Sequence, residues 1–226
     1  MMTYVTDEDV ALRAPADFLA LCPKDQVVAA GTDGLFLPSD PWTLRSPSVD
    51  FAGAGLAPGQ VARLAGPPAF GPQGELFAVA AVGPGGLSLR RLGQAPGVGR
   101  SPALAAEVLG VEFVVRTLAP QLGRACADLN LRFGIDEAAP GRRPCDLRAP
   151  RALADAAVLA VLAQRYLDQA RRFSGAADEP EDWYGVKSRA LRAELDDLLD
   201  RLVVRWGAAD PGRTAPSIRF STRLSR

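Results

Sequence analysis

The chain has 226 residues, 48% of them hydrophobic, and a formal net charge of zero. This length and composition are typical of a folded globular protein, and the neutral total excludes a whole-molecule attraction to nucleic acid or to an anionic membrane. The sequence contains no histidine, which excludes histidine general bases, Ser-His and Cys-His nucleophiles and histidine-ligated metals. Catalysis by carboxylates, lysine or tyrosine stays open.

The three cysteines, Cys22, Cys126 and Cys145, lie far apart and form no CxxC pair. They therefore indicate neither a zinc site nor a disulfide framework. No run of apolar residues reaches the roughly 18 that a membrane-spanning helix needs. The N-terminus is acidic where a signal peptide would be basic. We expect a protein made in the cytoplasm, with no metal, no cofactor and no membrane partner.

The first 24 residues predict a short helical segment. Thr6 with Asp9 three positions later resembles a capping box, and the helix should run to about Ala14, before Pro15. The acidic residues of its first turn are expected to stabilise the helix N-terminus and not to catalyse a reaction.

Residues 25–118 differ in composition, because most of the glycines and prolines fall here between short apolar runs. Five or six such runs predict strands of a small β-barrel or β-sandwich. The predicted strands are 27–30, 35–37, 61–64, 76–82, 87–92 and 111–118. Residues 83–86 (Gly-Pro-Gly-Gly) and Pro58-Gly59 predict turns, because glycine and proline favour turn conformations. The glycine-rich segments 49–61 and 93–102 lack the context of nucleotide-binding loops.

Three helices are predicted to follow. The first runs from Pro120 to Phe133, with Gly134 as its C-terminal cap, and the others span about 151–173 and 181–205 as an antiparallel pair. Trp183 and Tyr184 should pack back onto the preceding helix. In the last of these helices, a stripe of leucines should face the core, and acidic residues and arginines should form a solvated face on the opposite side. The stripe is Leu191, Leu195, Leu198, Leu199 and Leu202.

The predicted fold is therefore α+β. Residues 1–24 and 119–207 would form an antiparallel α-helical bundle, residues 25–118 an inserted small β-barrel or β-sandwich, and residues 208–226 an extended C-terminal tail. Residues 217–224 alternate apolar and basic side chains with the period of a strand. Such a strand must either return to the β module or pair with another chain. The candidate partner-binding residues are Ile218, Arg219, Phe220, Thr222, Arg223 and Leu224.

Three segments carry a resemblance to a known family. They are the opening residues 4–10 (YVTDEDV), residues 128–135 (DLNLRFGI), and residues 183–207 with Trp183, Tyr184, Lys187 and Trp206. Together they resemble the head–tail adaptor (connector) proteins of tailed bacteriophages. The β module is similar to small β domains of virion neck and tail components. The simplest adaptors are mainly helical, so head-closure and tail-terminator proteins are alternatives.

The resemblance implies a structural virion protein of the neck, assembled in the host cytoplasm and without enzymatic activity. Such a protein forms a ring, commonly of twelve subunits, beneath the portal protein, and it contacts head-closure or tail proteins. The ring joins capsid to tail and continues the channel, through which DNA passes without sequence-specific binding. The C-terminal tail would dock onto the portal, and the charged helix face would contact neighbouring subunits. Two readings stay open: a cytoplasmic protein-binding scaffold, and an enzyme that uses carboxylates or Tyr166 and Tyr184.

Overall fold

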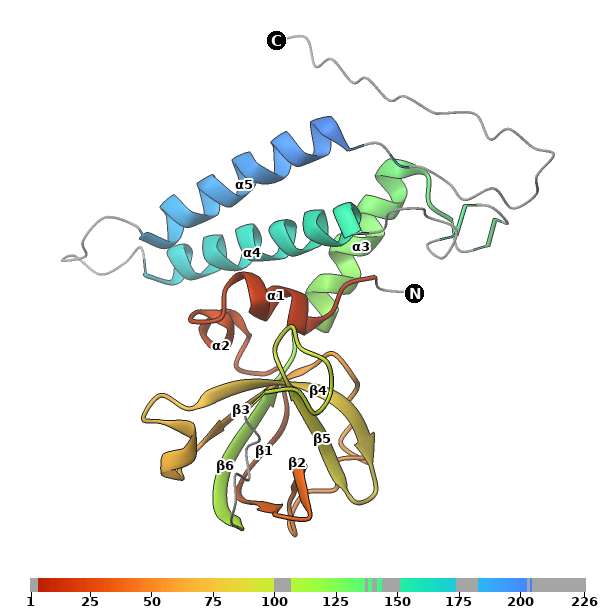
Figure 1. Cartoon of the computed structure of the whole chain (residues 1–226). Coiled ribbons are helices and arrows are strands. Elements are labelled where there is room, and N and C mark those ends of the chain that lie inside the picture. Colours follow the sequence, from red (N-terminus) through yellow and green to blue (C-terminus); the bar gives the residue numbers. More distant parts are fainter. Residues whose placement is uncertain are drawn as a thin grey trace. The chain divides into compact units, whose positions relative to one another are not determined.

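The computed structural model describes residues 4–99, 107–136, 138–139, 142–143, 151–173, 183–202 and 204. Its contacts divide the chain into two units (Figure 1). One comprises Thr6–Pro120, and the other comprises the described residues of Met1–Val5 and Gln121–Arg226. Among the described residues, no helix is both long enough and apolar enough to span a membrane.

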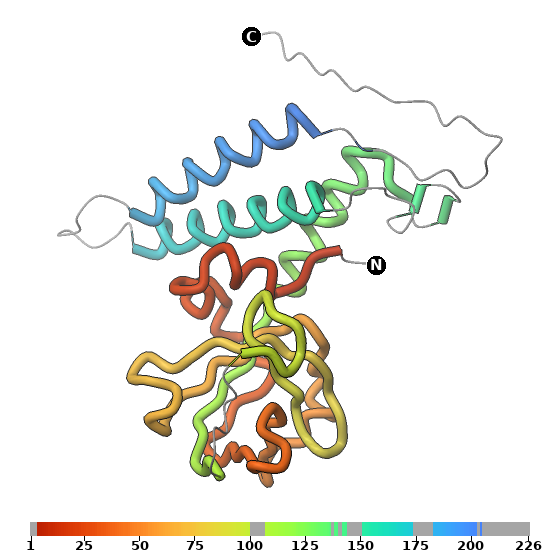
Figure 2. Tube along the Cα trace, viewed as in Figure 1, coloured from red at the N-terminus to blue at the C-terminus, as the bar shows by residue number. Residues whose placement is uncertain are grey.

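The first unit is built around a closed β-barrel of six strands. In order around the barrel these are β1 (Val27–Leu37), β2 (Asp40–Arg45), β5 (Gly86–Arg91), β4 (Glu75–Gly83), β3 (Val61–Ala65) and β6 (Val108–Arg116). Every neighbouring pair is antiparallel, and pairing of β6 with β1 closes the barrel. Figure 2 follows the chain through these strands. The prediction of a small barrel in this part of the sequence is confirmed.

Two strand predictions need correction. The runs at 27–30 and 35–37 are the two ends of one strand, β1, which continues through Gly31 and Gly34 with shifts of register against β6. Position 34 requires a glycine, because a Cβ atom there would lie only 2.8 Å from the Val111 carbonyl oxygen. The strand β2 was not predicted, because Pro41 within it is a residue that usually interrupts strands.

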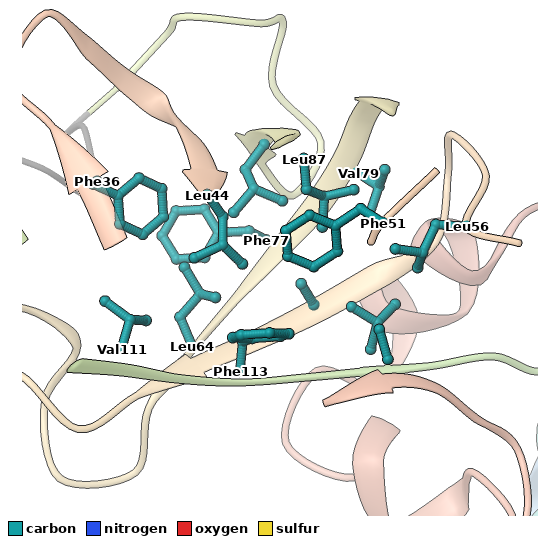
Figure 3. Packing of buried hydrophobic residues seen from close by; sticks show 14 of the residues in the cluster. Phe36, Leu44, Phe51, Leu56, Leu64, Phe77, Val79, Leu87, Val111 and Phe113 are labelled. Carbon is teal, nitrogen blue, oxygen red and sulfur yellow. The ribbon is translucent and has the colours of Figure 1, made fainter. Parts of the chain in front are cut away.

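The barrel interior is filled by side chains that alternate along the strands (Figure 3). Val111, Phe113 and Val115 of β6 are buried, and Glu112 between them is exposed. Phe70 and Phe77 meet edge to face, with ring centroids 6.3 Å apart. Burial of such side chains is the main stabilising contribution to a domain of this size.

Two short helices precede the barrel strands, α1 (Asp7–Arg13) and α2 (Phe18–Leu21). Their buried residues include Val10, Ala11, Phe18 and Leu21. The contacts place both helices in the barrel unit, whereas the sequence analysis grouped residues 1–24 with the later helices.

The second unit contains α3 (Ala119–Phe133), α4 (Arg151–Phe173) and α5 (Trp183–Arg201). The predicted cap of α3 is present, because Gly134 has φ +65° and the Ile135 amide donates to the Asn130 carbonyl at 2.8 Å. Helices α4 and α5 run side by side in opposite directions (Figure 1).

The predicted antiparallel helical bundle is wrong. The close helix–helix contacts lie between α4 and α5, and α3 is steeply inclined to α4 and does not run alongside it (Figure 1). Only Gly185 and Ser188 of α5 are buried, and the predicted core leucines of this helix are half-buried. A bundle needs a third helix packed along this pair, and α3, the other described helix of this unit, does not take this place.

Candidate functional site

Three places could carry function: the acidic motif at α1, the α4–α5 hairpin, and the predicted partner-binding tail. Ile218, Arg219, Phe220, Thr222, Arg223 and Leu224 lie outside the described residues. The first two places belong to different units and are described separately.

The capping box at α1 is confirmed. The Thr6 amide donates to Asp9 Oδ2 at 2.7 Å, and the Thr6 hydroxyl donates to the same oxygen at 2.9 Å. This carboxylate thus satisfies a backbone donor that helix geometry leaves without an intrahelical acceptor. Asp9 therefore orients the start of α1.

Asp7 is 2% exposed and tied to the end of the barrel. Its Oδ2 accepts from the Thr117 hydroxyl and its Oδ1 from the Leu118 amide, both at 2.7 Å. Burial raises the pKa of this carboxyl from 3.8 to about 6, against the lowering effect of the two hydrogen bonds. Asp7 therefore stabilises the junction between β6 and α3 at an electrostatic cost.

Glu8 is also buried, and it forms an ion pair with Arg90 of β5 through both carboxylate oxygens. The Gly93 amide donates to Glu8 Oε1 at 2.9 Å. Arg90 further donates to the Gln94 carbonyl at 3.0 Å. The pair therefore fixes α1 to β5 and to the turn that follows it.

The three acids of the motif thus have separate structural roles: Asp9 caps the helix, as expected for the first turn, whereas Asp7 and Glu8 bind Leu118 and Arg90. Their partners were not predicted, because Glu8 and Arg90 are 82 positions apart and Asp7 and Leu118 are 111 apart. No local sequence signal connects such pairs.

A second polar cluster holds the loop after β2. Asp33 accepts from the Ser46 hydroxyl at 2.8 Å and from the Ser48 amide at 2.9 Å. Hydrogen bonds from Ser48 and Ser46 lower the pKa of Asp33. The sequence analysis did not identify this cluster, which pins the loop to β1.

The barrel also carries a shallow groove of about 420 Å3 over β1, β3 and β6. Its main cation, Arg63, donates twice to the Gln73 carbonyl, at 3.0 and 2.8 Å. The groove is lined by Ala30, Gly31, Thr32, Arg63, Ala65, Glu112, Phe113 and Val114. Because Arg63 already holds a turn, the groove offers little that could orient a ligand.

In the helical unit, α4 and α5 approach each other through small residues. The Ser188 hydroxyl, in a side chain that is 5% exposed, donates to the Ala163 carbonyl at 2.8 Å. Gly185 is buried one turn earlier. Small side chains allow the close approach that this hydrogen bond requires.

Aromatic rings gather where the hairpin closes. Tyr184 stacks on Phe173 with centroids 5.6 Å apart, and Trp183 meets Tyr166 edge to face at 6.0 Å. The Lys187 ammonium lies 3.8 Å from the Trp183 ring centroid, a cation–π contact. The prediction that Trp183 and Tyr184 pack back onto the preceding helix is confirmed.

The outer face of α5 is charged and exposed, as predicted. Asp197 and Arg201 form an ion pair one turn apart on it. Its other charged residues are Arg189, Arg192, Glu194, Asp196 and Asp200. The five leucines on the opposite side are only half-buried. The surface of this helix therefore includes both charged side chains and partly exposed apolar side chains.

Buried thiols occur in both units. Cys22 and Cys126 are 3% and 0% exposed, and Cys145 lies outside the described residues. Burial raises the pKa of Cys126, and burial together with the neighbouring Cys126 thiol raises the pKa of the Tyr4 phenol. Both groups therefore stay protonated near neutral pH. The described residues include no group of three or more His, Cys, Asp or Glu residues arranged to hold a metal.

Comparisons with protein-family models, with curated proteins and with solved structures find no match to this chain.

Proposed function

We propose that the chain is a structural protein of the head–tail connector of a tailed bacteriophage. It forms a ring beneath the portal, commonly of twelve subunits, that joins capsid to tail and continues the DNA channel. It acts in the neck of the virion after assembly in the host cytoplasm, and it is not an enzyme. The proposal starts from the resemblance of residues 4–10, 128–135 and 183–207 to adaptor proteins.

The observation that carries the proposal is the surface of α5. This helix buries only Gly185 and Ser188, and it leaves a leucine stripe half-exposed beside a row of charges. Half-exposed apolar side chains along a helix are typical of surfaces that bind other protein chains. A ring component needs such a surface for its neighbours.

The closed barrel supports a partner outside the subunit for the predicted tail strand. All six strands are paired on both sides, so the barrel has no open sheet edge to which residues 217–224 could add. A neighbouring copy would carry the same closed barrel. Of the partners considered in the sequence analysis, the portal therefore fits best.

The net charge of the chain supports a role as a channel component. The formal net charge is zero, and each phosphate contact avoided lowers the affinity for DNA. A subunit without a net positive field would let DNA pass.

A second candidate is a head-closure or tail-terminator protein of the same neck. The observation that favours it is the barrel itself, which with α1 and α2 makes up Thr6–Pro120, a larger β module than the simplest adaptors have. A cytoplasmic scaffold would use the same α5 surface without any portal.

The test removes residues 208–226 and measures binding to purified portal by co-sedimentation. We expect the truncated protein to keep its circular dichroism spectrum and melting temperature and to lose portal binding. The matched control keeps the tail but scrambles residues 217–224, so that composition and charge are retained and the alternation is lost. Binding that persists after truncation would contradict the proposed role of the tail.

A further inference from the structure

The charges of α5 are separated along the helix. Residues 183–192 contain three cations and no acid, whereas residues 193–201 contain four acids and one cation. Asp197 of the acidic half is paired with Arg201, the cation of that half. A helix with this order of charges is complementary to an oppositely oriented copy of itself, because the basic half of each copy then lies beside the acidic half of the other.

Two cations and two acids share one side of α5. They are Arg189, Arg192, Asp196 and Asp200, and all four are exposed. With about 100° between successive residues of a helix, they fall within a sector of roughly 80°. None of the four forms an ion pair with another residue that the structure describes. Arg192 and Asp196 are four positions apart, but the basic residue comes first, which is the less favourable order for pairing within a helix. We call these four residues the charged flank.

The spacing of the charged flank fits antiparallel pairing with a second copy of the chain. In this arrangement Arg189 lies opposite Asp200 of the second copy, and Arg192 lies opposite its Asp196. The midpoints of both pairs lie close to Glu194 and differ by half a residue, which is about 0.75 Å at 1.5 Å per residue. One two-fold axis near Glu194 therefore brings both pairs together, and each pair occurs twice.

The residues that border the charged flank permit a close approach. Ala193 and Leu199 lie on its two sides, each about 20° beyond it. Ala193 is exposed and adjacent to the two-fold axis, so its small side chain lets the two helices come near each other. Leu199 is half-buried, and in the paired arrangement it covers the aliphatic stem of Arg192 in the second copy.

We propose that two copies of the free protein associate through their charged flanks, with the two α5 helices antiparallel. Both copies use the same surface, so the contact closes at two chains. A parallel pairing in the same register would place like charges opposite each other and is disfavoured. A ring joins two different surfaces of its subunits, so this dimer is a separate state of the free protein. The inference therefore goes beyond the proposed function and does not rest on it.

Sedimentation equilibrium of the full-length protein, over a series of protein concentrations, measures this association. We expect a monomer–dimer equilibrium that shifts toward the monomer as the salt concentration rises, because salt screens exposed charges. A mass of one chain at every concentration would overturn the proposal. Assemblies that grow beyond two chains would also overturn it, since they require a head-to-tail contact that does not close.

Two variants test the charges of the flank. One replaces both cations (Arg189→Glu and Arg192→Glu), and the other replaces both acids (Asp196→Arg and Asp200→Arg). In either variant, attraction becomes repulsion at all four contacts of the dimer. We therefore expect the dissociation constant of the dimer to rise at least about tenfold for each variant alone.

The matched control carries Lys24→Glu and Arg124→Glu, the same change of charge as in the first variant, at exposed residues outside α5. It should associate like the parent. Parent-like association of either flank variant, or an equal weakening in the control, would contradict the proposal. Circular dichroism verifies that each variant is folded.

Mixing the two flank variants tests whether the flanks contact each other. In the mixture, one chain carries four acids on its flank and the other carries four arginines, so every contact again joins opposite charges. We expect dimers that contain one chain of each variant, and a chain with all four changes should dimerise with itself. Failure of both to associate would overturn the proposal. These measurements use no portal, so their outcome is independent of the test of the proposed function.

Discussion

Asp7 accepts a hydrogen bond at 2.7 Å from the Leu118 amide, which lies 111 positions away in the sequence. The same carboxylate accepts from the Thr117 hydroxyl, so the first turn of α1 holds the chain where it leaves β6. One buried carboxylate thus connects the start and the end of the barrel unit.

The first prediction concerns the pH dependence that Asp7 confers. Its pKa is about 6 in the folded protein against the usual 3.8, so the folded state binds the proton more tightly than the unfolded state. The contribution of Asp7 to the free energy of unfolding is therefore largest below pH 4, falls between about pH 4 and 6, and is constant above that range. At 1.36 kcal/mol per pKa unit, the fall is about 3 kcal/mol.

The measurement compares Asp7→Asn with the parent by urea unfolding at several pH values. Asparagine can accept from the Leu118 amide and donate to the Thr117 hydroxyl without a buried charge. The stability of the parent minus that of the variant should fall as the pH rises from 4 to 6. A difference that is constant with pH, or rises, would contradict this account. Asp7→Leu also leaves the Leu118 amide unpaired and should therefore be less stable than Asp7→Asn by about 1–3 kcal/mol at every pH.

The second prediction concerns the buried ion pair of α1. Glu8→Gln should lower the free energy of unfolding by about 2–4 kcal/mol, because it leaves the Arg90 guanidinium partly buried without a carboxylate. The matched control is Glu75→Gln, which removes the more exposed pair with Arg91 and should cost less than about 1 kcal/mol. Urea unfolding of both variants at pH 7.5 tests this; equal losses would show that the burial of the Glu8 pair is unimportant.

The third prediction concerns the close approach of β1 to β6 at Gly34. Gly34→Ala should lower stability by about 1–3 kcal/mol, because the new Cβ would lie 2.8 Å from the Val111 carbonyl oxygen and the backbone would have to shift. Gly85→Ala, in the β4–β5 turn, is the control, since no other atom lies within 4 Å of its Cβ position. In thermal unfolding, Gly34→Ala should melt at a lower temperature than Gly85→Ala. If both variants melt like the parent, the close packing of β1 against β6 does not require a glycine at position 34.

Local patterns in the sequence predicted much of the fold. Residues 151–173 form α4 as expected, because their apolar residues keep the spacing of a helix through 23 residues. Pro120 and Gly134 marked the ends of α3, because each favours the backbone conformation of that position. Residues 83–86 formed the turn between β4 and β5.

Long-range relationships could not be predicted. The stripe of leucines in α5 showed that one side is apolar, but periodicity does not indicate which element covers it, and the expected bundle was wrong. The sequence indicated only that Glu8 and Asp7 are acids in the first turn of a helix. It did not indicate their partners, Arg90 and Leu118, because these lie in distant segments. The tail residues 217–224 lie outside the described residues, so their role stays a prediction.

The central claim is tested most directly by imaging the full-length protein with purified portal by negative-stain electron microscopy, alongside mass photometry of the protein alone and of the mixture. The account predicts portal rings with a second ring attached on one face, of a mass that corresponds to about twelve copies of this chain. A protein that stays monomeric and leaves portal particles unchanged in mass and shape would contradict it.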